Sequence, residues 1–354
     1  MRVRISSFLA CIVVACSLQA QRYHVSPIQA ATTEGTSDNT FPWASSSMRR
    51  YQQIHSDMPS TTMRITTLGF RQNATTSTYT GTRTIDMELS MGRGVVYDRV
   101  QLTFDKNYVA GSKAMVIARK KINISGGATV DPGPCPFDGK LEIKLDVPYT
   151  YLPSDSLVWD VIIYSNIVLG NFGALDADAC PTTLVSATSF GTGCTATGQV
   201  YAMSFVASGS DNGGTLGLLF SLSNGPVSAP VLMILGTQQL DLPVTGFCTN
   251  LYTDLLLVLP MGATDATGRW FEALVAPNPG AGSLSAQAIT IDVGQAGFPL
   301  AATNRRTVTI PAPNTTKVLR VTRLTNTDNV PTATKAMFFS TSSVGYGLVT
   351  RFTY

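Results

Sequence analysis

Histidine is nearly absent from this sequence, and so are long apolar segments and sustained helical periodicity. Among 354 residues there are two histidines, His24 and His55, and charged side chains make up only 13% of the chain. A zinc site with three histidine ligands is therefore excluded by count. A Ser-His-Asp triad would have to use one of these two residues, and no Gly-x-Ser-x-Gly motif accompanies them. The scarcity of histidine argues against the commonest hydrolytic chemistries.

No segment beyond the first 20 residues is long and apolar enough to form a membrane-spanning helix. The chain begins MRVRISSFLACIVVACSLQAQ, with two arginines, a short apolar stretch and a small-residue cleavage pattern. These features predict a signal peptide over residues 1–20 and a secreted, extracellular mature chain without a transmembrane segment. The alternative is a bacterial lipobox at residues 13–16, which would make Cys16 a lipid anchor.

Charge of either sign is not in excess. Removal of residues 1–20 leaves 23 basic and 22 acidic side chains. A chain so nearly neutral has no electrostatic footprint for a phosphate backbone, so no nucleic-acid partner is expected.

Four of the six cysteines follow the expected signal peptide: Cys135, Cys180, Cys194 and Cys248. In a secreted protein they predict disulfides, and four cysteines allow three pairings. A domain boundary near residue 185 favours Cys135–Cys180 and Cys194–Cys248, each closing a loop of about 50 residues and stabilising the fold by about 4 kcal/mol. Cys194 lies in Gly-Thr-Gly-Cys, where a catalytic thiolate would need a base that the sequence hardly offers, so we expect a disulfide there.

Period-two alternation is the main structural signal in the chain. Ile85, Met87, Leu89 and Met91 share one parity and alternate with polar residues, as strands with one buried face do. Many similar short segments follow, separated by Gly, Pro and Asn. The pattern predicts an all-β protein of tandem antiparallel β-sandwich domains, jelly-roll or Ig-like, with a β-rich C-terminal tail.

Composition divides the chain into five segments. After the signal peptide, residues 21–48 lack any apolar period and predict a flexible leader. The tail either completes a sandwich or forms a small third unit. The remaining boundaries predict β-sandwich domain 1 over 49–183, β-sandwich domain 2 over 184–293 and the tail over 294–354.

Several turn and strand motifs carry a family resemblance. They include FGTGC at 190–194, LSNGP at 222–226, DATG at 265–268, RYQQI at 50–54 and VPYTY at 147–151. On these motifs, residues 187–292 and 50–166 resemble tandem β-sandwich modules of uncharacterised secreted proteins from planctomycete-type bacteria. The resemblance implies fold and export, and it names no catalytic residue.

Aromatic residues give one candidate binding site. Trp270 follows a turn, and Tyr149 and Tyr151 share one face of a strand. Exposed rings of this kind could stack on sugar rings, although most aromatics in strands belong to the core.

Acidic residues give two more candidates. Asp176, Asp178 and Asp211 lie in loops rich in oxygen ligands and could bind calcium, although they lack the spacing of a known calcium loop. No other cofactor is expected. Other carboxylates could form the acid pair of a glycoside hydrolase if the fold brought two together: Asp86, Glu88, Asp98, Asp155, Asp160, Asp254 and Glu272.

The sequence therefore predicts a secreted, non-catalytic structural or adhesive protein of the cell surface or extracellular matrix. Its expected partners are further copies of itself, joined by strand addition, or surface glycans. A carbohydrate-binding module is the alternative, and a glycoside hydrolase is the third hypothesis.

Overall fold

The computed structural model describes residues 22–46, 50–153, 155–328, 330–331, 333–336 and 344–354. The expected signal peptide and Cys16 lie outside these described residues. Within them the elements are strands and two short 3-10 helices, η1 (Ile28–Ala30) and η2 (Phe104–Asn107), without an α-helix. The strand pairs are antiparallel. The prediction of an all-β antiparallel chain is confirmed.

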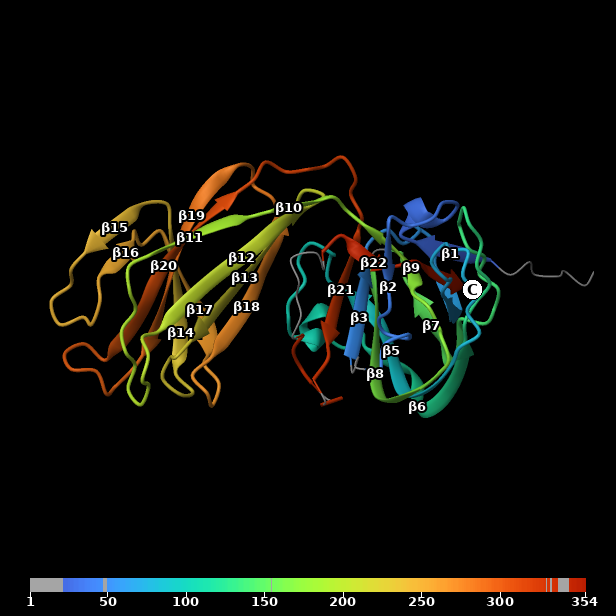
Figure 1. The fold of residues 1–354 in the computed structure, drawn as a ribbon, viewed down its shortest axis with the longest axis horizontal. Coiled ribbons are helices and arrows are strands. Elements are labelled where there is room, and N and C mark those ends of the chain that lie inside the picture. Colours follow the sequence, from blue (N-terminus) through green and yellow to red (C-terminus); the bar gives the residue numbers. More distant parts are fainter. Residues whose placement is uncertain (1–21, 47–49, 154, 329, 332, 337–343) are drawn as a thin grey trace, which may run out of the picture.

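The strands form two groups of sheets that lie side by side (Figure 1). We call them β-unit 1 and β-unit 2. In β-unit 1 the sheet orders are β21-β3-β8-β5-β6, β1-β23-β4-β7 and β2-β9-β22. Its strands are β1 (Tyr23–Ser26), β2 (Ser37–Asn39), β3 (Arg50–His55), β4 (Met63–Gly69), β5 (Thr82–Gly94), β6 (Ala114–Ser125), β7 (Glu142–Tyr151), β8 (Ser156–Leu169), β9 (Leu175–Ala179), β21 (Val321–Asn326), β22 (Tyr346–Leu348) and β23 (Thr350–Thr353).

β-unit 2 has sheets of order β10-β12-β13-β18 and β11-β20-β19-β14-β17, and a pair β15-β16. Its strands are β10 (Thr182–Leu184), β11 (Ser186–Phe190), β12 (Ser204–Asn212), β13 (Thr215–Ser223), β14 (Pro230–Gly236), β15 (Gln239–Leu242), β16 (Leu251–Thr253), β17 (Leu257–Ala263), β18 (Trp270–Pro277), β19 (Gly282–Ile291) and β20 (Leu300–Ile310).

Alternation along β5 explains the core of β-unit 1. Ile85, Met87 and Leu89 are fully buried, whereas Asp86 and Glu88 between them stay partly exposed. The buried side chains join residues of β4 and β7 in one apolar cluster, so the two larger sheets share a core. Each such side chain contributes about 1.5–3 kcal/mol by leaving water. β-unit 2 has its own cluster.

A third apolar cluster joins the two units. Phe271 and Ala273 of β18 pack against a buried cluster of β-unit 1 that includes Val100, Leu102 and Phe104. This contact holds the outer face of the β13-β18 sheet against the segment that leads into η2.

The C-terminal strands return to the first unit. β20 belongs to β-unit 2, whereas β21 pairs with β3, β22 with β9, and β23 with both β1 and β4. The segment expected as one tail is therefore divided, and β-unit 2 lies between two parts of β-unit 1 along the chain.

The expected flexible leader is ordered instead. β1 pairs with β23 and β2 pairs with β9. Trp43 is fully buried, and its ring stacks on Trp159 with centroids 6.3 Å apart. Short strands at sheet edges and a single large aromatic residue leave no periodic signal in the sequence. The prediction of a flexible leader from composition was therefore wrong.

One of the two expected disulfides is present. Cys194 and Cys248 are bonded across a sequence separation of 54 residues, with Cα atoms 5.4 Å apart. The expected Cys135–Cys180 bond is wrong, because both cysteines are free and buried in different surroundings. The Sγ of Cys135 accepts the N–H of Val130, whereas that of Cys180 accepts the N–H of Leu319.

Non-reducing peptide mapping is expected to recover the Cys194–Cys248 peptide and to find Cys135 and Cys180 as free thiols. Burial raises the pKa of both thiols, so little thiolate forms in the folded protein. Iodoacetamide should therefore label them only after unfolding. Recovery of a Cys135–Cys180 peptide would contradict the structure.

Candidate functional site

The expected aromatic platform is not exposed. Tyr149 and Tyr151 belong to the core of β-unit 1, because both point inward from β7 while Thr150 between them points out. Trp270 is 4% exposed and its indole N–H donates to the carbonyl of Met261 at 2.7 Å. It borders a pocket of about 420 Å³ between the units, beside Lys335, but its ring faces are covered. The prediction that these three rings present stacking faces is wrong.

The three aspartates expected to bind calcium are buried among hydrogen-bond donors. Asp176 pairs with Arg71 at 2.6 Å, and Asp178 forms an ion pair with Lys317. Within the described residues, no three His, Cys, Asp or Glu side chains gather where a metal ion could be held. Asp176 and Asp178 are paired with cations of the chain itself and Asp211 accepts amide and backbone N–H groups, so the calcium expectation has no support.

Asp211 lies apart from the other two, at the end of β12. Its carboxylate accepts the side-chain amide of Asn278 at 2.7 Å and the backbone N–H of Asn314 at 2.8 Å. These bonds fix the connection that leads from β20 toward β21.

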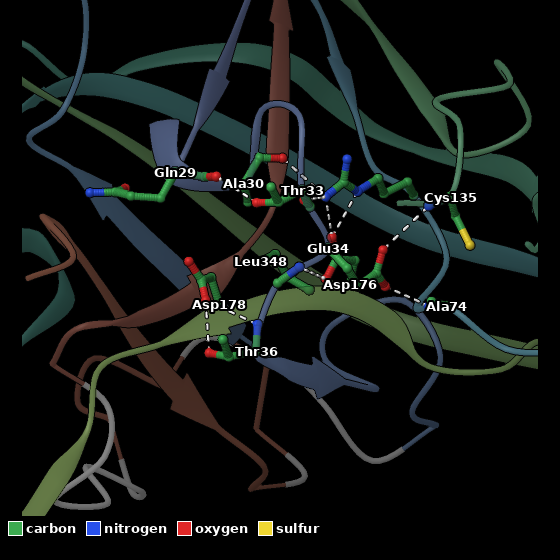
Figure 2. Close-up of polar contacts among 12 residues, drawn as sticks. Gln29, Ala30, Thr33, Glu34, Thr36, Ala74, Cys135, Asp176, Asp178 and Leu348 are labelled. Atoms are coloured by element: carbon green, nitrogen blue, oxygen red, sulfur yellow. Dashed lines mark hydrogen bonds and ion pairs between the residues drawn. The ribbon is translucent and has the colours of Figure 1, made fainter. Parts of the chain in front are cut away.

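Arg71 and Asp176 fasten the N-terminal segment to β-unit 1, and Figure 2 shows Asp176 beside Ala30 and Thr33 of that segment. The Nε of Arg71 donates to Asp176 at 2.7 Å, and its Nη2 donates to the carbonyls of Ala30 and Thr33 at 3.0 and 2.6 Å. Asp176 also accepts the N–H of Gly35 at 3.0 Å. Burial raises the pKa of Asp176 to about 7, although Arg71 opposes the shift. The ion pair thus holds backbone that would otherwise be unpaired.

Two further carboxylates complete this attachment. Glu34 accepts the backbone N–H groups of Ala74 and Cys135, and Asp178 accepts both the N–H and the hydroxyl of Thr36. Side chains therefore bind the segment between β1 and β2 where strand pairing does not.

A buried Ser-His-Asp arrangement lies at the end of β3. The Oγ of Ser26 is 2.6 Å from Nδ1 of His55 and donates to Asp57. On the other side of the ring, the indole N–H of Trp159 lies 3.0 Å from Nε2 of His55, and Gln53 lies 3.1 Å from it. An indole nitrogen can only donate, so Nε2 accepts and the proton resides on Nδ1.

This proton placement is the reverse of a catalytic triad. A base must accept the serine proton, whereas His55 here donates to Ser26. Burial lowers the pKa of His55 to about 3, and both Ser26 and His55 are fully buried. The chain of hydrogen bonds runs from Trp159 through His55 and Ser26 to Asp57, and it fixes the carboxylate.

Asp57 is where this chain reaches the surface. Its second oxygen accepts the N–H of Ile28 at 2.8 Å, and burial raises the pKa of its carboxyl group. Ser56 and Met58, the residues on either side of Asp57, border two pockets of about 540 and 300 Å³. We call the two together the Met58 groove, and Asp155 and Tyr151 border its smaller part.

Asp57, Ser26 and Arg71 were not predicted as site residues from the sequence. Asp57 follows a strand by two positions, which is a signal that could have drawn attention to it. Ser26 and Arg71 have no such mark, because their partners are 29 or more residues away in the chain.

The other carboxylates considered for hydrolysis are mostly engaged. The contacts are Asp86 with Arg119, Glu88 with Tyr164, Asp155 with Arg93, Asp160 with Arg50, Glu272 with Lys335, and Asp254 with the backbone N–H groups of Thr237 and Gln238. These contacts give six of the seven residues a structural role.

A row of exposed apolar side chains lies at one edge of β-unit 2. Leu255 and Leu256 are 62% and 66% exposed, and Leu257 and Val258 are about half exposed. β17 is the last strand of its sheet. From Leu255 to Thr264 the chain carries no charged side chain.

Neither protein-family models nor curated proteins give a match to this chain. The family resemblance read from its turn motifs therefore stays a prediction. No helix within the described residues has the length and apolar character needed to cross a membrane.

Proposed function

We propose that the chain is a secreted, non-catalytic structural or adhesive protein of tandem β-sandwiches that assembles with further copies of itself through the Leu255–Val258 row. The observation that carries the proposal is this row of exposed apolar side chains at an uncharged sheet edge. Soluble proteins ordinarily guard edge strands with charge, because unpaired edges and apolar patches bind other chains. The Cys194–Cys248 disulfide supports an oxidising compartment.

A second copy is the partner that best fits this edge. An edge with an excess of charge of one sign repels a second copy of itself, whereas a neutral edge does not. The edge strand β6 of β-unit 1 bears Arg119, Lys120 and Lys121, all exposed, whereas the Leu255–Val258 row has no charge to repel its copy. Pro260 has no backbone N–H to donate to a neighbouring strand, whereas the exposed leucines before it keep theirs.

A non-catalytic role is supported by the direction of the Ser26–His55 hydrogen bond and by the engaged carboxylates described above. The burial of Trp270, Tyr149 and Tyr151 leaves no observation in favour of sugar stacking on those rings.

Sedimentation velocity over a wide range of concentration tests the assembly. The wild-type chain is expected to form dimers or larger species as concentration rises. Leu256→Asp should need at least tenfold higher concentration for the same degree of assembly, because two like charges would face one another across the contact. Val200→Asp is the matched control, since Val200 is 85% exposed and lies outside the row.

A wild-type chain that remains monomeric throughout would reject self-assembly. Equal assembly of the wild type and Leu256→Asp would place the contact on another surface.

A further inference from the structure

The Met58 groove is a built cavity on β-unit 1 that the proposed assembly does not use. Its two parts, of about 540 and 300 Å³, are each within the size range of small-molecule sites. Ser56 and Met58 border both parts, so the turn after β3 forms the ridge between them. Walls come from segments far apart in sequence, including η1, the approach to β21 and the β7-β8 connection.

The polar groups around the groove include both acceptors and donors. Asp57 contributes a carboxylate to the larger part and Asp155 contributes one to the smaller part. Arg320 adds N–H donors in the larger part, and the side-chain amide of Gln29, one N–H of which donates to the carbonyl of Val318, adds a second N–H. Between them, Met58 provides an apolar surface. The groove thus offers hydrogen bonds of both kinds beside apolar contact.

Both carboxylates are held in place before a ligand arrives. Asp57 is fixed by Ser26 and the N–H of Ile28, and Ser26 is fixed in turn by buried His55. Asp155 pairs with Arg93 at 2.6 Å. A carboxylate has about four acceptor positions, so Asp57 can still accept from a ligand. Because these groups are already ordered, binding would cost little side-chain entropy.

This chemistry selects among ligand classes. A polyanion would meet two carboxylates, and a bare metal ion would lack a third acidic or histidine ligand within the described residues. A neutral sugar has hydroxyls that donate to carboxylates, oxygens that accept from Arg320 and Gln29, and C–H faces that pack on Met58.

We propose that the Met58 groove binds a neutral oligosaccharide, with sugar units on both sides of Met58 and with Asp57 and Asp155 accepting sugar hydroxyls. The buried Ser26–His55 chain then acts as the support that positions Asp57. This assignment is independent of assembly through the Leu255–Val258 row.

Titration calorimetry of the full-length protein tests the proposal with neutral xylo-, manno-, malto- and cello-oligosaccharides, and with an oligogalacturonate as the charged probe. At least one neutral series should bind. Asp57→Asn and Arg320→Ala should each weaken that binding at least tenfold, since each removes a hydrogen bond to a charged group. Asp146→Asn is the control, because Asp146 is an exposed carboxylate on β7 whose partner is Lys120.

If Asp57→Asn disturbs folding, Arg320→Ala still tests the proposal, because Arg320 is exposed and its replacement should leave the fold intact. Binding that survives Arg320→Ala, preference for the oligogalacturonate, or no binding of any neutral series would each overturn the assignment. Leu256→Asp should leave the affinity unchanged, which separates this result from the test of assembly.

Discussion

Replacing Arg71 by methionine is expected to lower the free energy of unfolding by about 3–5 kcal/mol, the usual cost of removing one partner from a buried ion pair. Asp176 would remain buried without its cation, and the carbonyls of Ala30 and Thr33 would lose their donor. Urea unfolding of the wild type and the variant at neutral pH measures the difference. A loss below about 1 kcal/mol would mean that the N-terminal segment does not depend on this pair.

The loss in free energy of unfolding caused by Arg71→Met should grow with pH. The pKa of Asp176 is about 7 in the folded protein and near 3.8 when unfolded, so folding retains a proton between these values. A raised carboxyl pKa costs stability as pH increases through this window. Without Arg71 the pKa rises further, so the deficit is smaller at about pH 5 than at about pH 8.

Two further variants isolate the ion pair. Arg64→Met replaces an exposed arginine of β4 and should change stability by less than about 0.5 kcal/mol. The double variant Arg71→Met with Asp176→Leu should recover part of the loss, and more of it at about pH 8 than at neutral pH, because it also removes the carboxyl group that is left buried without its cation.

Strands with one buried face could be predicted from the sequence because each is read from its own residues. Ile85, Met87 and Leu89 lie at alternate positions and all point into the core. The position of β1 and β2 could not be predicted in this way. β1 and β2 are held in place by pairing with β23 and β9, and β23 lies more than 300 residues from β1 in the chain.

The candidate site could not be predicted from the sequence for a related reason. Tyr151 and Asp155 were considered separately, yet both border the Met58 groove, which forms only when the turn after β3 packs beside the β7-β8 connection. Asp178 and Lys317 likewise meet across 139 residues, so an aspartate that looked available for calcium has a partner no local pattern could supply.

The second large effect concerns acid. The pKa of His55 is about 3 in the folded protein against 6.5 when unfolded, because a charged imidazole is strongly disfavoured in the core. Below about pH 6.5 His55 binds a proton in the unfolded chain but not in the folded chain, so the free energy of unfolding falls as pH decreases. Over the whole window this one residue can cost up to about 5 kcal/mol.

Comparison of the wild type with His55→Gln isolates this contribution. The wild-type free energy of unfolding should fall more steeply between about pH 6 and pH 4, by up to about 1.4 kcal/mol per pH unit. Asp176 acts in the opposite direction over the same range, and His24, whose pKa burial also lowers, acts in the same direction as His55. Asp176 is present in each protein, so its effect cancels in the difference. The charge of His24 also lowers the pKa of His55, so the difference includes the coupling between these two histidines. Parallel profiles would contradict this prediction, because they would mean that His55 binds protons equally in both states. The burial of His55 against Trp159 and Phe352 is the reason for expecting a difference.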